Sequence, residues 1–124
     1  RRRLIGPVGY PAQFRVDDDK VRRYLLDPDH EDGGPKCAFL LSLGFAIDDP
    51  ITLMTALVGH PTPSTLTRAY PVPYGLRYHF EGPMPCPNGT AANIRTVWQV
   101  DDQPGLHPAR FITLKPLRKA PRDP

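Results

Sequence analysis

The sequence contains few cysteines and no long apolar segment. Its two cysteines, Cys37 and Cys86, are far apart and form neither a CxxC motif nor a Cys/His spacing typical of a metal site. This favours two free thiols in a reducing compartment, with a disulfide as the alternative. The most apolar stretch, Ala38–Ile47, is much shorter than the roughly 20 residues that a membrane-spanning helix needs. We therefore expect no metal, no cofactor and no contact with a membrane.

A uniformly basic surface is also absent. The formal net charge is +3, but seven of the sixteen cations lie among the first three and the last ten residues. Between Leu4 and Leu114, nine cations are set against twelve acids. This balance argues against a nucleic-acid-binding surface of uniform positive charge. The basic ends either contact phosphate or are simply solvated.

Helix signals occupy the first half of the chain, whose 124 residues are typical of one domain. Acidic residues that suit a helix N-terminus begin a predicted helix over Asp17–Leu26, which ends before Pro28. A second helix is predicted over Pro35–Leu43 with Gly44 as its stop, and a third over Pro50–Val58. The proline-rich segment His60–Pro73 is predicted to be a long connection.

Strand signals occupy the second half. Apolar and polar residues alternate over Leu76–Glu81, Asn93–Val100 and Arg110–Leu114, and Pro83–Gly89 is predicted to be a loop that turns at Asn88-Gly89. The sequence therefore predicts an α+β fold in which N-terminal helices precede an antiparallel β-sheet. Within it we expect an irregular arm or linker over residues 1–15, one domain over 16–116, and a basic, proline-containing tail over 117–124.

The alternation also predicts two different faces of the sheet. The apolar face, on which the helices would pack, combines Leu76, Tyr78, Phe80, Ile94, Trp98, Val100, Ile112 and Leu114. The opposite face collects Arg77, His79, Glu81, Arg95, Gln99 and Thr113. Neighbouring strands hold such groups about 5 Å apart, close enough to act on one phosphate. The simpler interpretation is that a solvent-facing sheet surface is polar in any case.

The polar set contains the groups that RNA cleavage requires. A base removes the proton of the 2′-hydroxyl, an acid protonates the departing 5′-oxygen, and cations stabilise the charge on the phosphoryl oxygens. No metal is needed, because the nucleophile belongs to the substrate. A second cluster places His30 in a glycine-rich loop and Lys36 in the first turn of a helix. An ordinary loop histidine is the alternative for His30, whereas His60 and His107 are interpreted as bystanders and Trp98 as core.

The order and spacing of several short segments resemble a known bacterial domain family, which is grouped with toxin ribonucleases of the barnase, EndoU, colicin and RelE type. The resemblance covers residues 16–116. It is carried by Tyr24–His30, Gly33–Cys37, Phe39, Leu43–Phe45, Tyr74–Tyr78, Glu81–Pro83, Arg95–Trp98 and Arg110–Thr113. The sequence departs from the family pattern at Cys37 and at Leu114-Lys115, and the second departure affects the expected substrate pocket.

The resemblance implies the same order of helices and sheet, and RNA, for example tRNA, as substrate. It also implies delivery as the C-terminal payload of a larger secreted protein that acts in the cytoplasm of a target cell, and a dedicated immunity protein as partner. The catalytic residues that it implies are His30, Lys36, Arg95 and Thr113. Residues implied or placed nearby as substrate contacts are Arg77, His79, Thr96 and Gln99.

The function predicted from the sequence is therefore a metal-independent endoribonuclease toxin. In this hypothesis His30 is general base or acid, Lys36 and Arg95 stabilise the phosphate, and Thr113 orients it. The alternative is a non-catalytic protein-binding module, such as an accessory or antitoxin-like partner, which the acidic balance of the central chain favours. Toxicity on expression separates the two functions.

Overall fold

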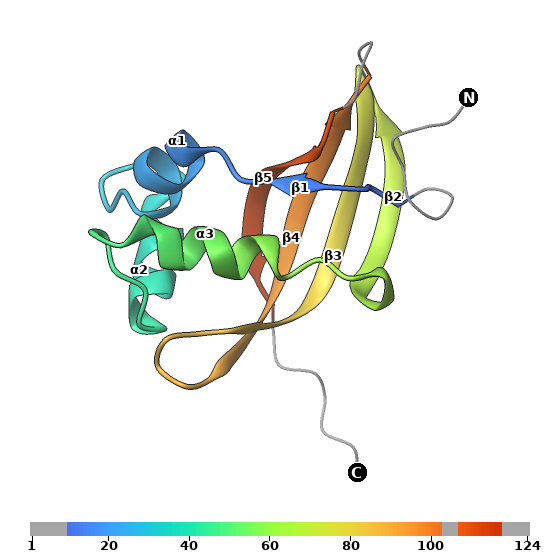
Figure 1. The fold of residues 1–124 in the computed structure, drawn as a ribbon. Helices are drawn as coiled ribbons and strands as arrows, with labels where there is room; N and C mark the ends of the chain where they lie inside the picture. Colours follow the sequence, from blue (N-terminus) through green and yellow to red (C-terminus); the bar gives the residue numbers. More distant parts are fainter. Residues whose placement is uncertain (1–9, 103–106, 118–124) are drawn as a thin grey trace.

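A computed structural model describes residues 10–102 and 107–117. The described chain forms a five-stranded sheet in the order β1-β5-β4-β3-β2. The helices lie beside the β5 edge of this sheet, and α3 runs from there toward β3 (Figure 1). Within the described residues, no helix has the length and apolarity needed to cross a bilayer.

The helices lie where the sequence predicts them. The first consists of α1 (Asp18–Lys20) and one π-helical turn, η1 (Val21–Leu25), in which the Leu26 amide donates to the Val21 carbonyl over 2.8 Å. The others are α2 (Gly34–Ser42) and α3 (Pro50–Val58). The side chain of Asp49 accepts hydrogen bonds from the amide and hydroxyl of Thr52, which satisfies one free amide of the α3 N-terminus.

The strands confirm the α+β class, with helices followed by a sheet that is antiparallel except at one edge. The antiparallel strands are β2 (Leu66–Val72), β3 (Gly75–Pro85), β4 (Ala91–Asp101) and β5 (Ala109–Pro116). A short strand β1 (Phe14–Arg15) precedes the helices and pairs in parallel with β5. The end of the predicted irregular arm is therefore part of the sheet. The rest of the arm up to residue 9, residues 103–106 and the tail from residue 118 lie outside the described residues.

The prediction of a long connection over His60–Pro73 is wrong, because this segment contains the 3₁₀ turn η2 (Pro63–Thr65) and the strand β2. Because of Pro71, the sequence did not predict this strand. A proline cannot donate to a ladder and therefore favours edge strands, and β2 lies at one edge of the described sheet, where it pairs with β3.

The predicted loop over Pro83–Gly89 begins later than expected. Strand β3 continues through Pro85, with Pro83 opposite Asn93 and Pro85 opposite Ala91. Beyond Phe80, β3 no longer pairs with β2. Pro83 and Pro85 are two residues apart, so for both of them the position of the absent N–H can lie on the side of β3 that faces away from β4. The turn at Asn88-Gly89 is confirmed, and Gly89 has a φ of 89°.

A β-bulge changes the predicted faces of the last strand. Val97 pairs with Thr113 but its neighbour Trp98 pairs with Phe111, so Ile112 is the additional residue. The predicted apolar face included Ile112 and excluded Phe111. In the structure, Phe111 is buried and Ile112 is only half-buried. The bulge therefore inserts Phe111 into the core and leaves Ile112 beside Thr113.

The core lies between the apolar face of the sheet and the helices. Trp98 is fully buried and meets Phe14 at 5.2 Å and Phe111 at 5.4 Å between ring centroids, both edge to face. Phe14 also contacts Phe80 at 5.7 Å. Such aromatic pairs each contribute about 0.5–1.5 kcal/mol beyond the burial of their area. Trp98 is thus a core residue, as the sequence predicts, and β1 is held to the sheet by its aromatic side chain.

Candidate functional site

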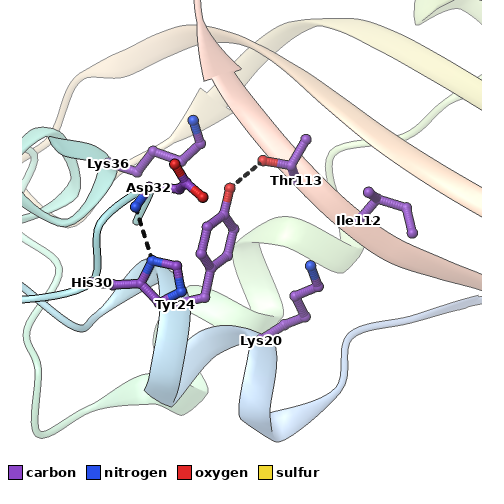
Figure 2. A pocket seen from close by; sticks show the side chains of 7 residues that line it. All are labelled: Lys20, Tyr24, His30, Asp32, Lys36, Ile112 and Thr113. Atoms are coloured by element: carbon purple, nitrogen blue, oxygen red, sulfur yellow. Dashed lines mark hydrogen bonds between the residues drawn. The ribbon is translucent and has the colours of Figure 1, made fainter. Parts of the chain in front are cut away.

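An open cleft of about 620 Å³ lies between the helices and the β5 edge of the sheet. Its walls come from α1 and η1, the loop before α2, the first turn of α2, and the bulged part of β5 (Figure 2). The residues that line it are Lys20, Tyr24, His30, Asp32, Lys36, Ile112 and Thr113. The cleft therefore brings His30 and Lys36 of the predicted loop cluster together with Thr113 of the predicted polar sheet face.

Tyr24 occupies the middle of the cleft and connects its walls. Its hydroxyl lies 2.7 Å from Oγ1 of Thr113, which links the π-helical turn to β5. The His30 ring meets the Tyr24 ring edge to face with centroids 5.1 Å apart, and the Lys20 ammonium lies 4.9 Å from the Tyr24 ring centroid. Figure 2 shows His30 and Lys20 on the two sides of Tyr24. A π-helical turn often marks a functional site, and here it supplies the central side chain.

The backbone of its own loop fixes the orientation of His30. Its Nδ1 accepts hydrogen bonds from the amide of Asp32 over 3.0 Å and from the amide of Gly33 over 2.9 Å. A nitrogen that accepts carries no hydrogen, so the neutral ring holds its hydrogen on Nε2. In this arrangement His30 can donate from Nε2, whereas protonation at Nδ1 would oppose two amide donors.

Glycine is required next to this histidine because the loop packs tightly on η1. A Cβ on Gly33 would lie against the carbonyl oxygen of Tyr24, well inside the 3.0 Å that real Cβ atoms keep. A Cβ on Gly34 would lie 2.8 Å from the carbonyl oxygen of Pro28. The sequence Gly33-Gly34 therefore permits the close approach that holds His30 against Tyr24.

Two half-buried lysines, Lys20 and Lys36, give the cleft its positive charge. The pKa of Lys20 is lowered, first by burial and then by the guanidinium groups of Arg110 and Arg77, while Asp17 opposes the shift. These arginines belong to the polar face of the sheet, so Lys20 lies where the cleft meets that face. Lys36 occupies the first turn of α2, where a second cation is available to a bound anion.

Hydrogen bonds organise the polar face beside the cleft. Arg77 Nε donates to Gln99 over 2.9 Å, and Gln99 donates to Asp101 over the same distance. Asp101 also accepts from Arg110 Nε over 2.9 Å, and the pKa of Asp101 is lowered chiefly by this hydrogen bond. The chain of contacts holds two guanidinium groups in fixed positions.

A second pair continues this face along the strands. Arg95 Nε contacts a carboxylate oxygen of Glu81 over 2.8 Å, with both side chains 31% exposed. His79 Nε2 lies 3.0 Å from the Tyr70 hydroxyl, and burial followed by nearby Arg95 and Arg68 lowers the pKa of His79. Arg95 is on the same face as Thr113 but two residues farther along the ladder, since Arg95 pairs with Lys115 and Thr113 pairs with Val97. It borders the cleft-forming strand without lining the cleft.

Comparisons with known proteins identify the family to which this domain belongs. A family model described as "Domain of unknown function (DUF6883)" matches residues 11–118. The chain belongs to this family. A search among curated proteins found no match. Among solved structures, the chain is similar to one from a "Contact-dependent growth inhibition toxin - immunity protein complex from Klebsiella pneumoniae 342", with a TM-score of 0.67 and 20% identity. The likeness covers 82% of this chain and 98% of that chain, and it shows a shared fold.

Three of the four predicted catalytic residues meet in the cleft of this DUF6883 domain. His30 and Lys36 come from the helical half, Thr113 comes from β5, and all three line the same space. The fourth, Arg95, stays on the neighbouring sheet face with its guanidinium on Glu81. The predicted substrate contacts Arg77, His79 and Gln99 also lie on that face, although Gln99 is only 6% exposed.

Thr96, which the sequence predicts as a substrate contact, does not line the cleft. It is fully buried on the core side of β4, where its hydroxyl contacts His60 Nδ1 over 2.7 Å and accepts from Trp98 Nε1 over 2.9 Å. His60 Nε2 lies 3.0 Å from the Gly82 carbonyl oxygen, and burial lowers the pKa of His60. Thr96 and His60 thus tie the end of α3 to the sheet.

Sequence reasoning missed the contributions of Lys20, Tyr24 and Ile112 to the cleft. Lys20 and Tyr24 are four residues apart, a spacing that puts two side chains on one side of a helix. That spacing identifies them as neighbours but not as parts of a site. Ile112 enters only because of the bulge. Within the described residues no group of His, Cys, Asp and Glu could hold a metal ion, and Cys37 and Cys86 are free thiols.

Proposed function

We propose that this domain is the catalytic part of a bacterial toxin that cleaves RNA without a metal ion. The observation that carries the proposal is the cleft, which gathers two ammonium groups, an imidazole and a pair of hydroxyls from distant parts of the chain. One phosphodiester with its 2′-hydroxyl needs such a set: cations near the phosphoryl oxygens and donors at defined positions.

The geometry refines the roles expected for these groups. His30 holds its hydrogen on Nε2 and serves as a hydrogen-bond donor to a phosphoryl oxygen, in place of the general base or acid expected from the sequence. Lys36 neutralises the same group. The hydroxyl pair of Tyr24 and Thr113 orients the phosphate, since its members are already fixed by a mutual hydrogen bond. A preorganised donor of this kind contributes about 2.7–4 kcal/mol to transition-state stabilisation in well-studied enzymes.

The polar sheet face supports the same function as an extension of the site. Arg77 and Arg95 each use Nε to contact a residue of the neighbouring strand. Each guanidinium group has four further N–H donors on its terminal nitrogens. Arginine contacts a phosphate through such a planar pair of donors. A nucleotide chain that leaves the cleft across β4 and β3 would meet them in turn.

The fold neighbour supports a toxin-related role and a protein partner. It is part of a complex between a growth-inhibition toxin and its immunity protein. For the present chain, we expect delivery within a larger effector, action in the target-cell cytoplasm and a cognate immunity protein. Because the cleft carries Lys20 and Lys36, the partner that blocks it should be acidic.

The test is inducible expression of residues 1–124 in bacteria, with total RNA and tRNA analysed on a gel. The parent chain should arrest growth and fragment RNA, and the purified domain should cleave in the presence of EDTA. His30→Ala, Lys36→Ala and Arg95→Ala should each remove the toxicity. Arg23→Ala is a matched control outside the cleft and should remain toxic. Normal growth with intact RNA and a soluble, folded parent domain would contradict the proposal.

The second candidate function is a protein-binding module without catalysis. Large apolar side chains favour it, because Ile51 and Val58 on α3 are 62% and 43% exposed and stand seven residues apart, on one side of the helix. This function predicts that the expressed domain leaves growth and RNA unchanged. It also predicts that Ile51→Ser abolishes partner capture while His30→Ala does not.

A further inference from the structure

The proposed reaction needs a group that accepts the 2′-hydroxyl proton, and the geometry of His30 does not provide it. The amides of Asp32 and Gly33 both donate to Nδ1, so the lone pair of this nitrogen already accepts hydrogen bonds and does not take up a proton from the substrate. The Nε2 nitrogen carries the hydrogen and is a donor. Another side chain in the cleft must therefore accept the proton.

Lys20 lies where such a group is needed. Its Nζ is 4.9 Å from the centroid of the Tyr24 ring, and the hydroxyl of that ring is bonded to Thr113 on the opposite wall. Lys20 is half-buried and lines the cleft (Figure 2). It takes part in none of the ion pairs within 4.0 Å found in residues 10–102 and 107–117.

We propose that Lys20 is the proton acceptor of this site, an inference that rests on the proposed ribonuclease function. The free amine of Lys20 takes the proton of a ribose 2′-hydroxyl while the 2′-oxygen forms a bond to phosphorus. The bond between phosphorus and the 5′-oxygen breaks, and the 5′-oxygen takes a proton from water, which reaches the open cleft. Lys20 then loses its proton to solvent. The products are a 2′,3′-cyclic phosphate and a 5′-hydroxyl end, with no change in oxidation state.

The electrostatic surroundings of Lys20 favour this role. Burial and the guanidinium groups of Arg110 on β5 and Arg77 on β3 lower the pKa of Lys20, whereas Asp17 and the face of the Tyr24 ring favour the charged form. Across the cleft stand the ammonium of Lys36 and the carboxylate of Asp32, with the rings of Tyr24 and His30 between. A lowered pKa increases the fraction of free amine near neutral pH, which a base requires and a phosphate-binding cation does not.

Replacing Lys20 by arginine distinguishes a base from a phosphate-binding cation, because a guanidinium keeps its charge but does not give up a proton near neutral pH. We expect Lys20→Arg to lower the cleavage rate at least about 100-fold, the usual contribution of a positioned base. It should also abolish the rise of the rate with increasing pH that we expect of the parent as Lys20 loses its proton. Lys36→Arg is the matched control, since Lys36 acts as a cation, and it should keep the pH profile of the parent.

Two further measurements exclude a folding or binding defect. At a pH low enough for Lys20 to carry its proton, Lys20→Arg should bind 2′-O-methyl RNA, which has no 2′-hydroxyl to lose, within about three-fold of the parent, because both side chains then carry one positive charge. Lys20→Cys alkylated with 2-bromoethylamine restores an amine and should recover cleavage, measured against the alkylated parent.

Each outcome bears on the inference. If Lys20→Arg cleaves with the rate and pH profile of the parent, Lys20 is a cation only and the inference fails while the ribonuclease function stands. If Lys20→Arg loses 2′-O-methyl RNA binding and cleavage together, Lys20 holds the substrate and the inference also fails. A parent domain that cleaves no RNA overturns the proposed function itself.

Discussion

Replacing Gly33 by alanine should displace His30 through a steric contact and without strain in the backbone dihedral angles. Gly33 has a φ of −84° and a ψ of −21°, values that alanine adopts freely, so its conformation does not require glycine. The obstacle is contact, because a Cβ there would meet the carbonyl oxygen of Tyr24 well inside 3.0 Å. The loop must therefore move away from η1 by a substantial part of an ångström.

The structure allows the magnitude to be worked out. Overpacking costs about 1–3 kcal/mol, and weakening the two amide bonds to His30 costs about 1 kcal/mol each. The lower chain entropy of alanine in the unfolded state returns only about 0.4–1 kcal/mol. We expect a net loss of about 2–5 kcal/mol. A displacement near 1 Å at a catalytic group lowers a rate about 100-fold.

Urea unfolding and RNA cleavage by purified domains provide the assay, with Gly59→Ala as the matched control. Gly59 has similar backbone angles, but a Cβ there would meet nothing closer than the Thr55 carbonyl oxygen at 3.5 Å. That variant should be unchanged or up to about 1 kcal/mol more stable. If Gly33→Ala unfolds at the same urea concentration as Gly59→Ala, and its His30 imidazole NMR signals match those of the parent, the reasoning is refuted.

Three further variants test individual contacts of the site and the core. Tyr24→Phe should lose about 1 kcal/mol, because it removes the hydrogen bond to Thr113, and should slow cleavage; equal stability of variant and parent in urea would contradict this. Tyr78→Phe is its counterpart, since the buried Tyr78 hydroxyl has no partner within the described residues, and it should be neutral or stabilising by urea unfolding. His60→Gln should reduce the acid sensitivity of folding. Burial lowers the pKa of His60, so its contribution is complete above the unfolded pKa of about 6.5 and is lost as the pH falls below it. Unfolding free energies measured at descending pH should therefore fall less steeply in the variant, with a residual slope from His79, whose pKa is also lowered; parallel slopes would exclude the role assigned to His60.

The helices illustrate what local sequence signals predict well. The α3 helix spans Pro50–Val58 in the structure, as the acidic pair before Pro50 and the glycine after Val58 indicate. The glycine stop after α2 is likewise confirmed, since Gly44 has a φ of 100°. These signals depend on residues within one helical turn of the helix end, so the helix boundaries can be predicted without knowledge of distant contacts.

The strands show where such signals fail. Strand β2 was missed because its proline is compatible only with an edge position, and strand order is a property of the whole sheet. The bulge at Ile112 shifts one residue of β5 against β4 and reverses the faces of Phe111 and Ile112. Neither feature has a local signal in the sequence.

The sequence by itself determined the α+β class, the helix boundaries and the residue types of the site, because each depends on periodicity, capping or side-chain chemistry within a short segment. Only the tertiary structure decided which groups share one cleft. It put Lys20 beside Tyr24 and Thr113, left Arg95 on the neighbouring face, and buried Thr96 with His60. The physical reason is that these contacts join residues far apart along the chain, and their geometry follows from helix packing, strand register and one bulge acting together.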